Sequence, residues 1–128
     1  MKAGLMVVGI VGAVLAGVSS TANAEDPKYD GNELLSQCQQ YIKVADSEPD
    51  YDRIDAGMCM GFVQGVYGTF SLLSEELNDG IKFCVPGSVT NSQLVRVVVK
   101  YLKNHPAQLN LYRTGLVWSA LKEAYPCK

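Results

Sequence analysis

The most regular apolar pattern in this chain lies in residues 90–106. Apolar side chains recur there at spacings of three and four residues, as on one face of an α-helix. These side chains are Leu94, Val97, Val98, Tyr101 and Leu102. A second apolar row and three basic residues share the rest of the helix surface: Val95, Val99, Arg96, Lys100 and Lys103. So little polar surface predicts a central helix that neighbouring segments cover on most sides.

The ends of this segment carry helix signals. Thr90 followed by Gln93 is a capping box, in which each side chain accepts a hydrogen bond from the other residue's backbone N–H. His105-Pro106 marks the C-terminal end, because proline disfavours helical backbone in the residue before it. The run of residues 94–99 is rich in β-branched residues, so a β-strand is the alternative. The capping box and the length of the periodic pattern favour the helix.

A first helix is predicted before an acidic connection. Asp30 or Asn32 can cap it, and its apolar face carries Leu34, Leu35, Cys38, Tyr41 and Ile42. Residues 46–55 then form a polar segment with five acidic residues, Asp46, Glu48, Asp50, Asp52 and Asp55. The glycine and the terminal glutamate of a calcium-binding EF-hand loop are missing. We therefore expect a solvated acidic loop that also caps the next helix.

The second helix is predicted from about Asp52 to Leu77. Its apolar positions keep approximate helical spacing: Cys59, Phe62, Val63, Val66, Phe70, Leu73 and Leu77. Four glycines also lie along it, Gly57, Gly61, Gly65 and Gly68. Each lowers helix propensity by about 1 kcal/mol relative to alanine. We expect this cost to be offset by close approach of another helix, the valine-rich one, with a local kink as the alternative.

A last helix completes an all-α prediction of about four helices. Residues 78–80 break the second helix, and residues 81–89 form a loop that contains Cys84. The last helix is predicted to begin at Pro106, which suits a first turn, and to stop at Pro126. Its apolar positions are Leu109, Leu116, Val117, Ala120, Leu121 and Ala124. The sequence predicts a compact helical bundle stapled by two disulfides.

The N-terminus has the pattern of a secretory signal peptide. Lys2 supplies a positive charge, residues 5–18 form an apolar run, and Ala22-Asn23-Ala24 is a small-residue cleavage site. We therefore expect residues 1–24 to be removed before Glu25, residues 25–31 to form a flexible lead-in, and residues 32–128 to form one domain. The exported product is expected to be soluble and periplasmic, with no membrane association after cleavage.

Charge and cysteines narrow the class of protein. The chain has 11 basic and 13 acidic residues, a net charge of −2, which does not suit a nucleic-acid binder. Its 4 cysteines form an even set, so two disulfides are expected in an oxidising compartment. Three connectivities are possible. We favour Cys38–Cys59 and Cys84–Cys127, because each joins consecutive helical segments.

Catalytic and metal-binding patterns are weak. His105 is the single histidine, and its position before proline suggests a structural or solvent-facing role. Met58 and Met60 flank Cys59 but are more typical of core packing than of a copper site. Glu75-Glu76 would need a buried pocket for acid–base chemistry. We expect no enzyme activity, no catalytic residue, no metal and no cofactor.

Several stretches of this chain form one recognisable pattern: residues 83–86, 89–95, 98–102, His105-Pro106, Leu109, 116–117, 120–121 and 124–127. This pattern resembles the Rap/Tai family of immunity proteins of bacterial type VI secretion, and the segment 59–66 is similar to that family's second helix. The match covers residues 34–127 and departs from the family pattern at 111–113. The resemblance implies a small periplasmic helical protein, often a homodimer, that binds and blocks a peptidoglycan amidase delivered by sister cells.

Two functions remain open at this point. One is an inhibitor specific for an amidase effector, the cognate toxin. The alternative is a general periplasmic stress protein or acid-activated chaperone, whose fold opens as carboxylates are protonated.

For an inhibitor, two acidic segments are candidate partner-binding elements. The first is residues 46–55, with Asp50 and Asp52, and the second is residues 75–80, with Glu75, Glu76 and Asp79. The first carries more charge and would steer association more strongly. The second lies nearer Cys84, so a disulfide would lower the entropy lost on binding. If neither segment contacts the partner, the exposed faces around Tyr112 and Trp118 are the next candidate binding surface.

Overall fold

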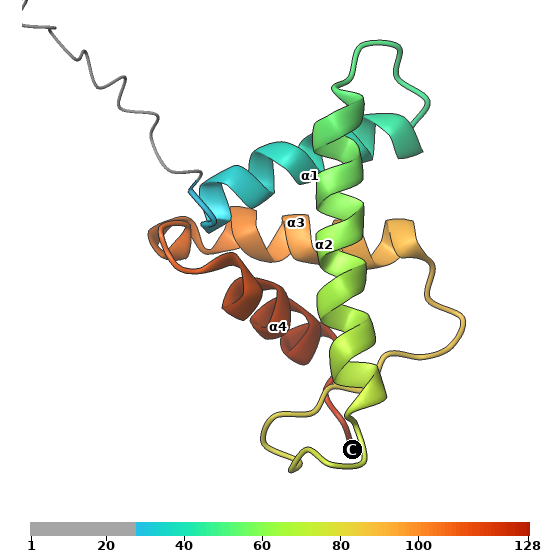
Figure 1. Ribbon diagram of the computed structural model, residues 1–128, viewed down its shortest axis with the longest axis vertical. Helices are drawn as coiled ribbons and strands as arrows, with labels where there is room; N and C mark the ends of the chain where they lie inside the picture. The colour runs from blue at the N-terminus through green and yellow to red at the C-terminus, as the bar shows by residue number, and fades with distance from the viewer. Residues whose placement is uncertain (1–27) are drawn as a thin grey trace, which may run out of the picture.

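The computed structural model describes residues 28–128 and contains four α-helices and one short 3-10 helix (Figure 1). These are α1 (Gly31–Ala45), α2 (Arg53–Leu72), α3 (Asn91–Asn104), η1 (Pro106–Gln108) and α4 (Arg113–Ala124). No strand is present in residues 28–128, apart from one isolated β-bridge between Asp30 and Tyr112. The all-α prediction is confirmed. The expected signal peptide, residues 1–24, lies outside the described residues.

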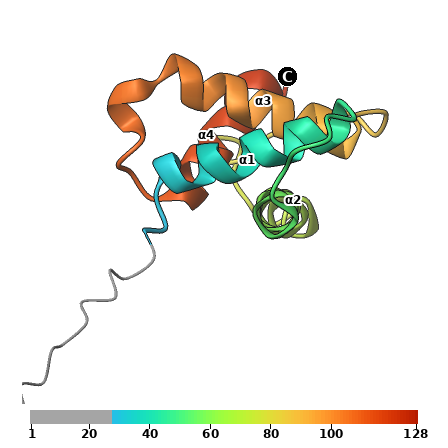
Figure 2. The same ribbon diagram turned by 90° about the horizontal axis from the view of Figure 1, so that it is seen from above.

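The helices form two crossed layers. α1 and α3 lie side by side, and α2 crosses them at a steep angle, so that α2 is seen end-on in Figure 2. α4 packs against α3 and touches both other helices. The interior is lined by side chains from all four: Leu34, Cys38, Cys59, Val63, Leu94, Val95, Val98, Leu102, Leu116, Val117 and Leu121.

The valine-rich helix α3 is central, as its pattern predicts. Leu94, Val98 and Leu102 are fully or almost fully buried, and the two second-row valines, Val95 and Val99, are buried as well. At its start the Thr90 hydroxyl accepts from the Gln93 backbone N–H at 3.2 Å, and the Gln93 side chain accepts from the Thr90 N–H at 2.7 Å. The capping box is therefore present, and the alternative of a β-strand is wrong.

His105 ends α3 and closes it with its own side chain. Its Nδ1 lies 2.7 Å from the carbonyl oxygen of Tyr101, and its ring stacks on the Tyr101 ring at 4.0 Å between centroids. This geometry agrees with the structural role that the sequence suggests for this histidine.

The two predicted disulfides are both present. Cys38–Cys59 joins α1 to α2, and Cys84–Cys127 joins the α2–α3 loop to the C-terminal tail. All four cysteines are used in these bonds.

The expectation of close helix packing on the glycines of α2 is wrong. A Cβ atom built on Gly57, Gly61, Gly65 or Gly68 would meet nothing within 4 Å. The buried side of α2 is instead formed by Ala56, Cys59, Val63 and Val66. Each glycine stands two residues from one of the last three positions, which is about 200° around a helix of 3.6 residues per turn. The glycines therefore lie on the open side of α2.

The second helix is shorter than predicted, ending at Leu72 rather than Leu77. Residues 73–77 form turns, in which the N–H groups of Glu76 and Leu77 both donate to the carbonyl of Leu73. The chain has to reverse here, because Phe83 packs back on Tyr67 and Phe70 of the same helix.

The last helix also differs from the prediction, since α4 begins at Arg113 and only η1 begins at Pro106. The backbone between η1 and α4 is hydrogen-bonded to the start of α1 instead. The N–H of Asn32 donates to the Leu109 carbonyl at 3.0 Å, and that of Gly31 to the Leu111 carbonyl at 3.2 Å. The N–H of Arg113, which would donate to the Leu109 carbonyl in a continuous helix, donates to the Tyr29 carbonyl instead, so the helix is interrupted.

The same contacts order the end of the predicted lead-in. The N–H of Arg113 donates to the Tyr29 carbonyl at 3.1 Å, and Asp30 caps α1 by accepting from the Glu33 N–H. This hydrogen bond lowers the pKa of the Asp30 carboxyl, with partial burial opposing the shift and the Asn32 side chain assisting it. Of the two predicted caps for α1, Asp30 is the one used.

Candidate partner-binding site

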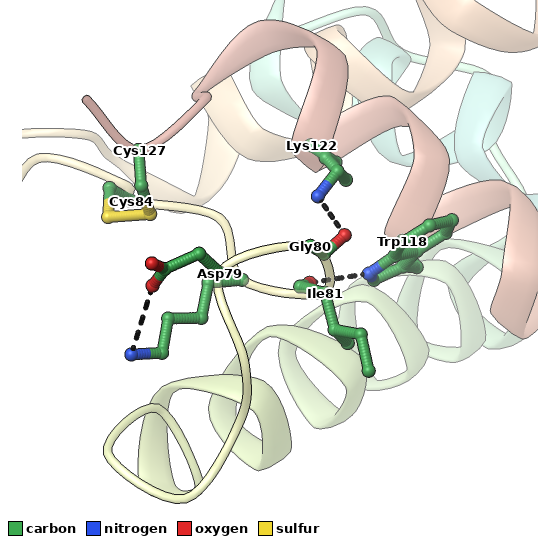
Figure 3. Close-up of a disulfide and its surroundings, with 8 residues drawn as sticks. Asp79, Gly80, Ile81, Cys84, Trp118, Lys122 and Cys127 are labelled. Atoms are coloured by element: carbon green, nitrogen blue, oxygen red, sulfur yellow. Dashed lines mark hydrogen bonds and ion pairs between the residues drawn. A yellow bond between two sulfur atoms is a disulfide. The ribbon is translucent and has the colours of Figure 1, made fainter.

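The loop between α2 and α3, residues 73–90, is fastened to α4 and the C-terminal tail. The Trp118 indole N–H donates to the carbonyl oxygen of Ile81 at 2.8 Å, and the Lys122 ammonium donates to the carbonyl of Gly80 (Figure 3). The Cys84–Cys127 disulfide lies beside them in the same view. Two hydrogen bonds and one disulfide thus hold this loop against α4 and the C-terminal tail.

The middle of this loop also reaches the hydrophobic core. Phe83 is 9% exposed, with its ring centroid 5.4 Å from that of Phe70. The N–H of Cys84 donates to the Tyr125 carbonyl at 2.8 Å. Because its base is buried and bonded in this way, the loop presents its outer side chains from a fixed position.

Exposed acidic and apolar side chains lie at the end of α2 and in the first part of this loop. Leu72 is 83% exposed, and Leu73 and Ile81 are also exposed. Glu75, Glu76 and Asp79 lie between them in the sequence and are all exposed to solvent. We call these six residues the 72–81 surface. In the sequence, all three candidate acids of this segment stand between large exposed apolar residues.

Asp79 is paired only loosely. Its carboxylate lies 3.7 Å from the Lys82 ammonium, and the aspartate side chain is 97% exposed. An ion pair so open to water contributes little to stability. The charge of Asp79 therefore stays available to a partner.

The first acidic segment is arranged differently. Asp46 pairs with Arg96 of α3, and the Asp52 carboxylate caps α2 by accepting from the N–H groups of Ile54 and Asp55 at 2.9 and 3.0 Å. Asp50 is exposed. Of the two candidate residues here, only Asp50 is free of a structural hydrogen bond in the described part of the chain.

The two acidic segments are not brought together. They lie at opposite ends of α2, whose 20 residues span roughly 30 Å at 1.5 Å per residue. A partner that contacts one end closely needs a large footprint to reach the other. They are therefore alternative sites.

Tyr112, Arg113 and Trp118, at the start of α4 and within it, differ in their exposure to solvent. Tyr112 is 69% exposed, whereas Trp118 is partly buried and directed towards Ile81 (Figure 3). Arg113 is 8% exposed, with its guanidinium carbon 4.1 Å from the Phe62 ring centroid and 4.8 Å from that of Tyr29. Its burial between two aromatic rings was not anticipated from the sequence.

The described residues show little that would suit metal chemistry. Within residues 28–128 no three His, Cys, Asp or Glu side chains are grouped as metal ligands. Met58 is 46% exposed and Met60 is partly buried, so Met58 does not fill the core. None of the helices in this part of the chain combines the length and apolarity that a membrane span requires.

Comparison with known proteins decides the family. The family described as Rap1a immunity proteins matches this chain over residues 30–127.

This chain belongs to the Rap1a immunity protein family.

The match begins at the Asp30 cap and ends at Cys127, so it includes both disulfides and the whole α2–α3 loop. Searches of curated proteins and of solved structures found no match. Membership of this family implies an immunity protein directed against a secreted effector.

Sequence reasoning named the acids of the 72–81 surface and predicted the disulfide that holds the loop, but it missed the two side chains of α4 that also fasten it. Lys122 and Trp118 act over 42 and 37 residues of sequence separation, and their partners are backbone carbonyls. A sequence pattern carries no signal for contacts of that kind. The exposure of Leu73 was also missed, because helical spacing placed it on the apolar face of a helix that ends one residue before it.

Proposed function

We propose that this protein is a periplasmic immunity protein that binds and inhibits a peptidoglycan amidase effector delivered by type VI secretion. Membership of the Rap1a family supports the immunity role. The signal-peptide pattern in residues 1–24 supports export. Two disulfides that use all four cysteines also favour an oxidising compartment.

The 72–81 surface is the binding element in this proposal. An amidase cleft of the Cys–His type is concave, with hydrogen-bond donors at its base, so a blocker needs an element that protrudes and offers acceptors. Glu75, Glu76 and Asp79 supply carboxylate acceptors, and the neighbouring leucines supply apolar contact area. The observation that carries the proposal is the fastening of this loop by Trp118, Lys122 and Cys127, because a fixed loop loses less entropy on binding.

Replacing the three acids tests this surface. The Glu75→Ala/Glu76→Ala/Asp79→Ala variant removes exposed side chains, so we expect unchanged helicity and a free energy of unfolding within about 0.5 kcal/mol of wild type. Inhibition of the cognate amidase should weaken by roughly tenfold or more, with most of the loss in the association rate. Circular dichroism, denaturation and peptidoglycan hydrolysis assays measure the three quantities.

The matched control lies at the other end of α2. Asp50→Ala removes an exposed acid from the first acidic segment and should leave inhibition unchanged. Asp52 does not serve as a control, because its loss also removes the cap of α2. Full inhibition by the triple variant, or a loss caused by Asp50→Ala, would move the contact away from the 72–81 surface.

A second pair of variants tests the apolar part. Leu72 and Ile54 both lie on α2 and are 83% and 77% exposed. Leu72→Asp should reduce affinity for the amidase, whereas Ile54→Asp should not, and neither should unfold the protein. Equal effects of the two substitutions would argue against a contact confined to the C-terminal end of α2.

Export and the alternative function have separate tests. N-terminal sequencing of the periplasmic protein should begin at Glu25, and recovery of Met1 from the cytoplasm would contradict export. The general-helper alternative predicts that the protein prevents aggregation of unrelated clients at acidic pH. Such activity without amidase inhibition would replace the present proposal.

A further inference from the structure

The two disulfides lie in different surroundings. Cys38 and Cys59 are both 0% exposed and belong to the hydrophobic core. Cys84 is exposed and Cys127 is partly buried, at the surface where the α2–α3 loop meets the tail. Thiol–disulfide exchange requires a thiolate to reach a sulfur atom, so access controls its rate. An added thiol reaches the second bond and not the first.

The exposed disulfide also fastens the 72–81 surface. Without it, the tip of the loop is held to α4 by two side-chain hydrogen bonds, from Trp118 to Ile81 and from Lys122 to Gly80. The Lys122 and Trp118 residues remain partly open to solvent, where water competes for these bonds. The base of the loop stays on the core through Phe83, with Val85 and Val89 packed beside it and the Cys84 N–H donating to the Tyr125 carbonyl.

We propose that Cys84–Cys127 is a redox latch, which dithiol reductants of the thioredoxin type open selectively, releasing the 72–81 surface and weakening inhibition of the effector. The consequence for inhibition rests on the proposed function. The selective opening of the latch does not, because it follows from exposure and from the contacts of the loop.

The chemistry balances with the reductant named. One thiolate of the dithiol attacks the sulfur of Cys84 or Cys127, forming a mixed disulfide and expelling the other cysteine as a thiolate that takes up a proton. The second thiol of the reductant then attacks the mixed disulfide and releases the remaining cysteine. Two electrons pass to the protein, and the reductant leaves as its own disulfide. Re-oxidation reverses the sequence.

The order of reduction is the first measurement. Oxidised protein is treated with increasing dithiothreitol without denaturant, alkylated at intervals and mapped by mass spectrometry. Cys84 and Cys127 should be alkylated while Cys38 and Cys59 remain bonded, and far-UV circular dichroism should keep its helical signal. Simultaneous loss of both bonds, or earlier loss of Cys38–Cys59, would overturn the proposal.

Trp118 reports whether the loop is released. It is the single tryptophan of the chain, and its indole N–H is bonded to the loop carbonyl of Ile81 (Figure 3). Its fluorescence should shift to longer wavelength in step with alkylation of Cys84 and Cys127. The Cys84→Ser/Cys127→Ser variant should show the same shifted spectrum without reductant. An unchanged spectrum in the singly reduced protein would show that the loop stays in place.

Inhibition of the cognate amidase is the third measurement, made with oxidised and singly reduced protein after removal of the reductant. The singly reduced form should inhibit roughly tenfold less well, since the loop must then be ordered on binding. Equal inhibition by both forms would overturn the latch and leave the proposed function intact. Lack of inhibition by the oxidised form would reject the proposed function. The order of reduction and the Trp118 fluorescence would still test whether the Cys84–Cys127 bond opens selectively and releases the loop.

Discussion

The two loops that flank α2 look alike in sequence and differ in structure. Each carries several carboxylates and a helix boundary. In the first, Asp46 pairs with Arg96 and Asp52 caps α2, so local carboxylates stabilise the fold. In the second, Glu75, Glu76 and Asp79 remain exposed, and the loop is held instead by Trp118 and Lys122 of α4 and by a disulfide.

This difference shows that a carboxylate engaged in the fold is not equivalent to an exposed carboxylate that can contact a partner. An acid that already accepts hydrogen bonds from a helix N-terminus loses them if a partner draws it away. An acid on a loop fastened through its backbone can meet a partner without any cost to the fold. In the first loop two of the five acids, Asp46 and Asp52, are engaged in the fold, whereas none of the three acids of the second loop caps a helix.

The largest expected effect comes from removing the disulfide of the second loop. Cys84→Ala/Cys127→Ala opens a link between residues 43 apart, which the chain-entropy relation values at about 4 kcal/mol of unfolding free energy. Amide hydrogen exchange should accelerate in residues 74–90 and stay slow at the Ile54 and Asp55 amides bonded to Asp52. Equal acceleration at both ends of α2 would show that the two loops are not anchored separately.

Glycine substitutions test the helix that joins the two loops. Alanine at Gly65 meets nothing within 4 Å, so Gly65→Ala should stabilise the protein by about 0.5–1 kcal/mol and leave both loops unchanged. At Gly31 a Cβ would collide with Leu116 Cδ1 and would lie 3.0 Å from the Leu109 carbonyl oxygen. Gly31→Ala should therefore destabilise the protein by about 1–3 kcal/mol through overpacking.

Denaturant unfolding measures both glycine variants. Destabilisation by Gly65→Ala would mean that another chain covers the open side of α2 in solution. In that case binding could not be assigned to the loops alone.

The acids of the first loop give a smaller effect. Asp52→Ala removes the side-chain cap of α2 and should cost about 1 kcal/mol of unfolding free energy, whereas Asp50→Ala should change it by less than about 0.5 kcal/mol. Chemical denaturation of the two variants gives the comparison directly. Equal costs would contradict the division of this loop into a capping acid and an available one.

The smallest effect concerns pH and another capping acid, Asp30. Its pKa lies below the ordinary value of 3.8 because the Glu33 N–H donates to the folded carboxylate. The stabilisation it supplies is present above the unfolded pKa and is lost as pH falls through the folded pKa. Asparagine keeps the cap but does not titrate.

Wild type should therefore lose stability more steeply than Asp30→Asn as pH drops below about 4. Denaturant midpoints of both proteins between pH 2 and 6 test this expectation. Parallel curves would show that Asp30 contributes no pH-dependent stability.

The local features of the sequence were enough to predict the helix caps and the buried face of α3. Thr90 and Gln93 cap α3, and Asp30 and Asp52 cap α1 and α2, because capping depends on residues within three positions of each other. The apolar spacing of α3 identified its buried face for the same reason. These signals act over one or two helical turns and can be read along the chain.

Tertiary structure decided where helices stop and which faces are covered. The carbonyls of Leu109 and Leu111 bond the start of α1, so a pattern that could have continued from Pro106 breaks before Arg113. The glycines of α2 suited either a close contact or an open face, and the packing of Cys59 and Val63 against α1 assigned them to the open face. The 72–81 surface acquired its position from Trp118 and Lys122, through backbone carbonyls 37 and 42 residues away. Such contacts depend on where the whole chain lies in space, because every residue offers the same carbonyl group and only the fold selects which one is met.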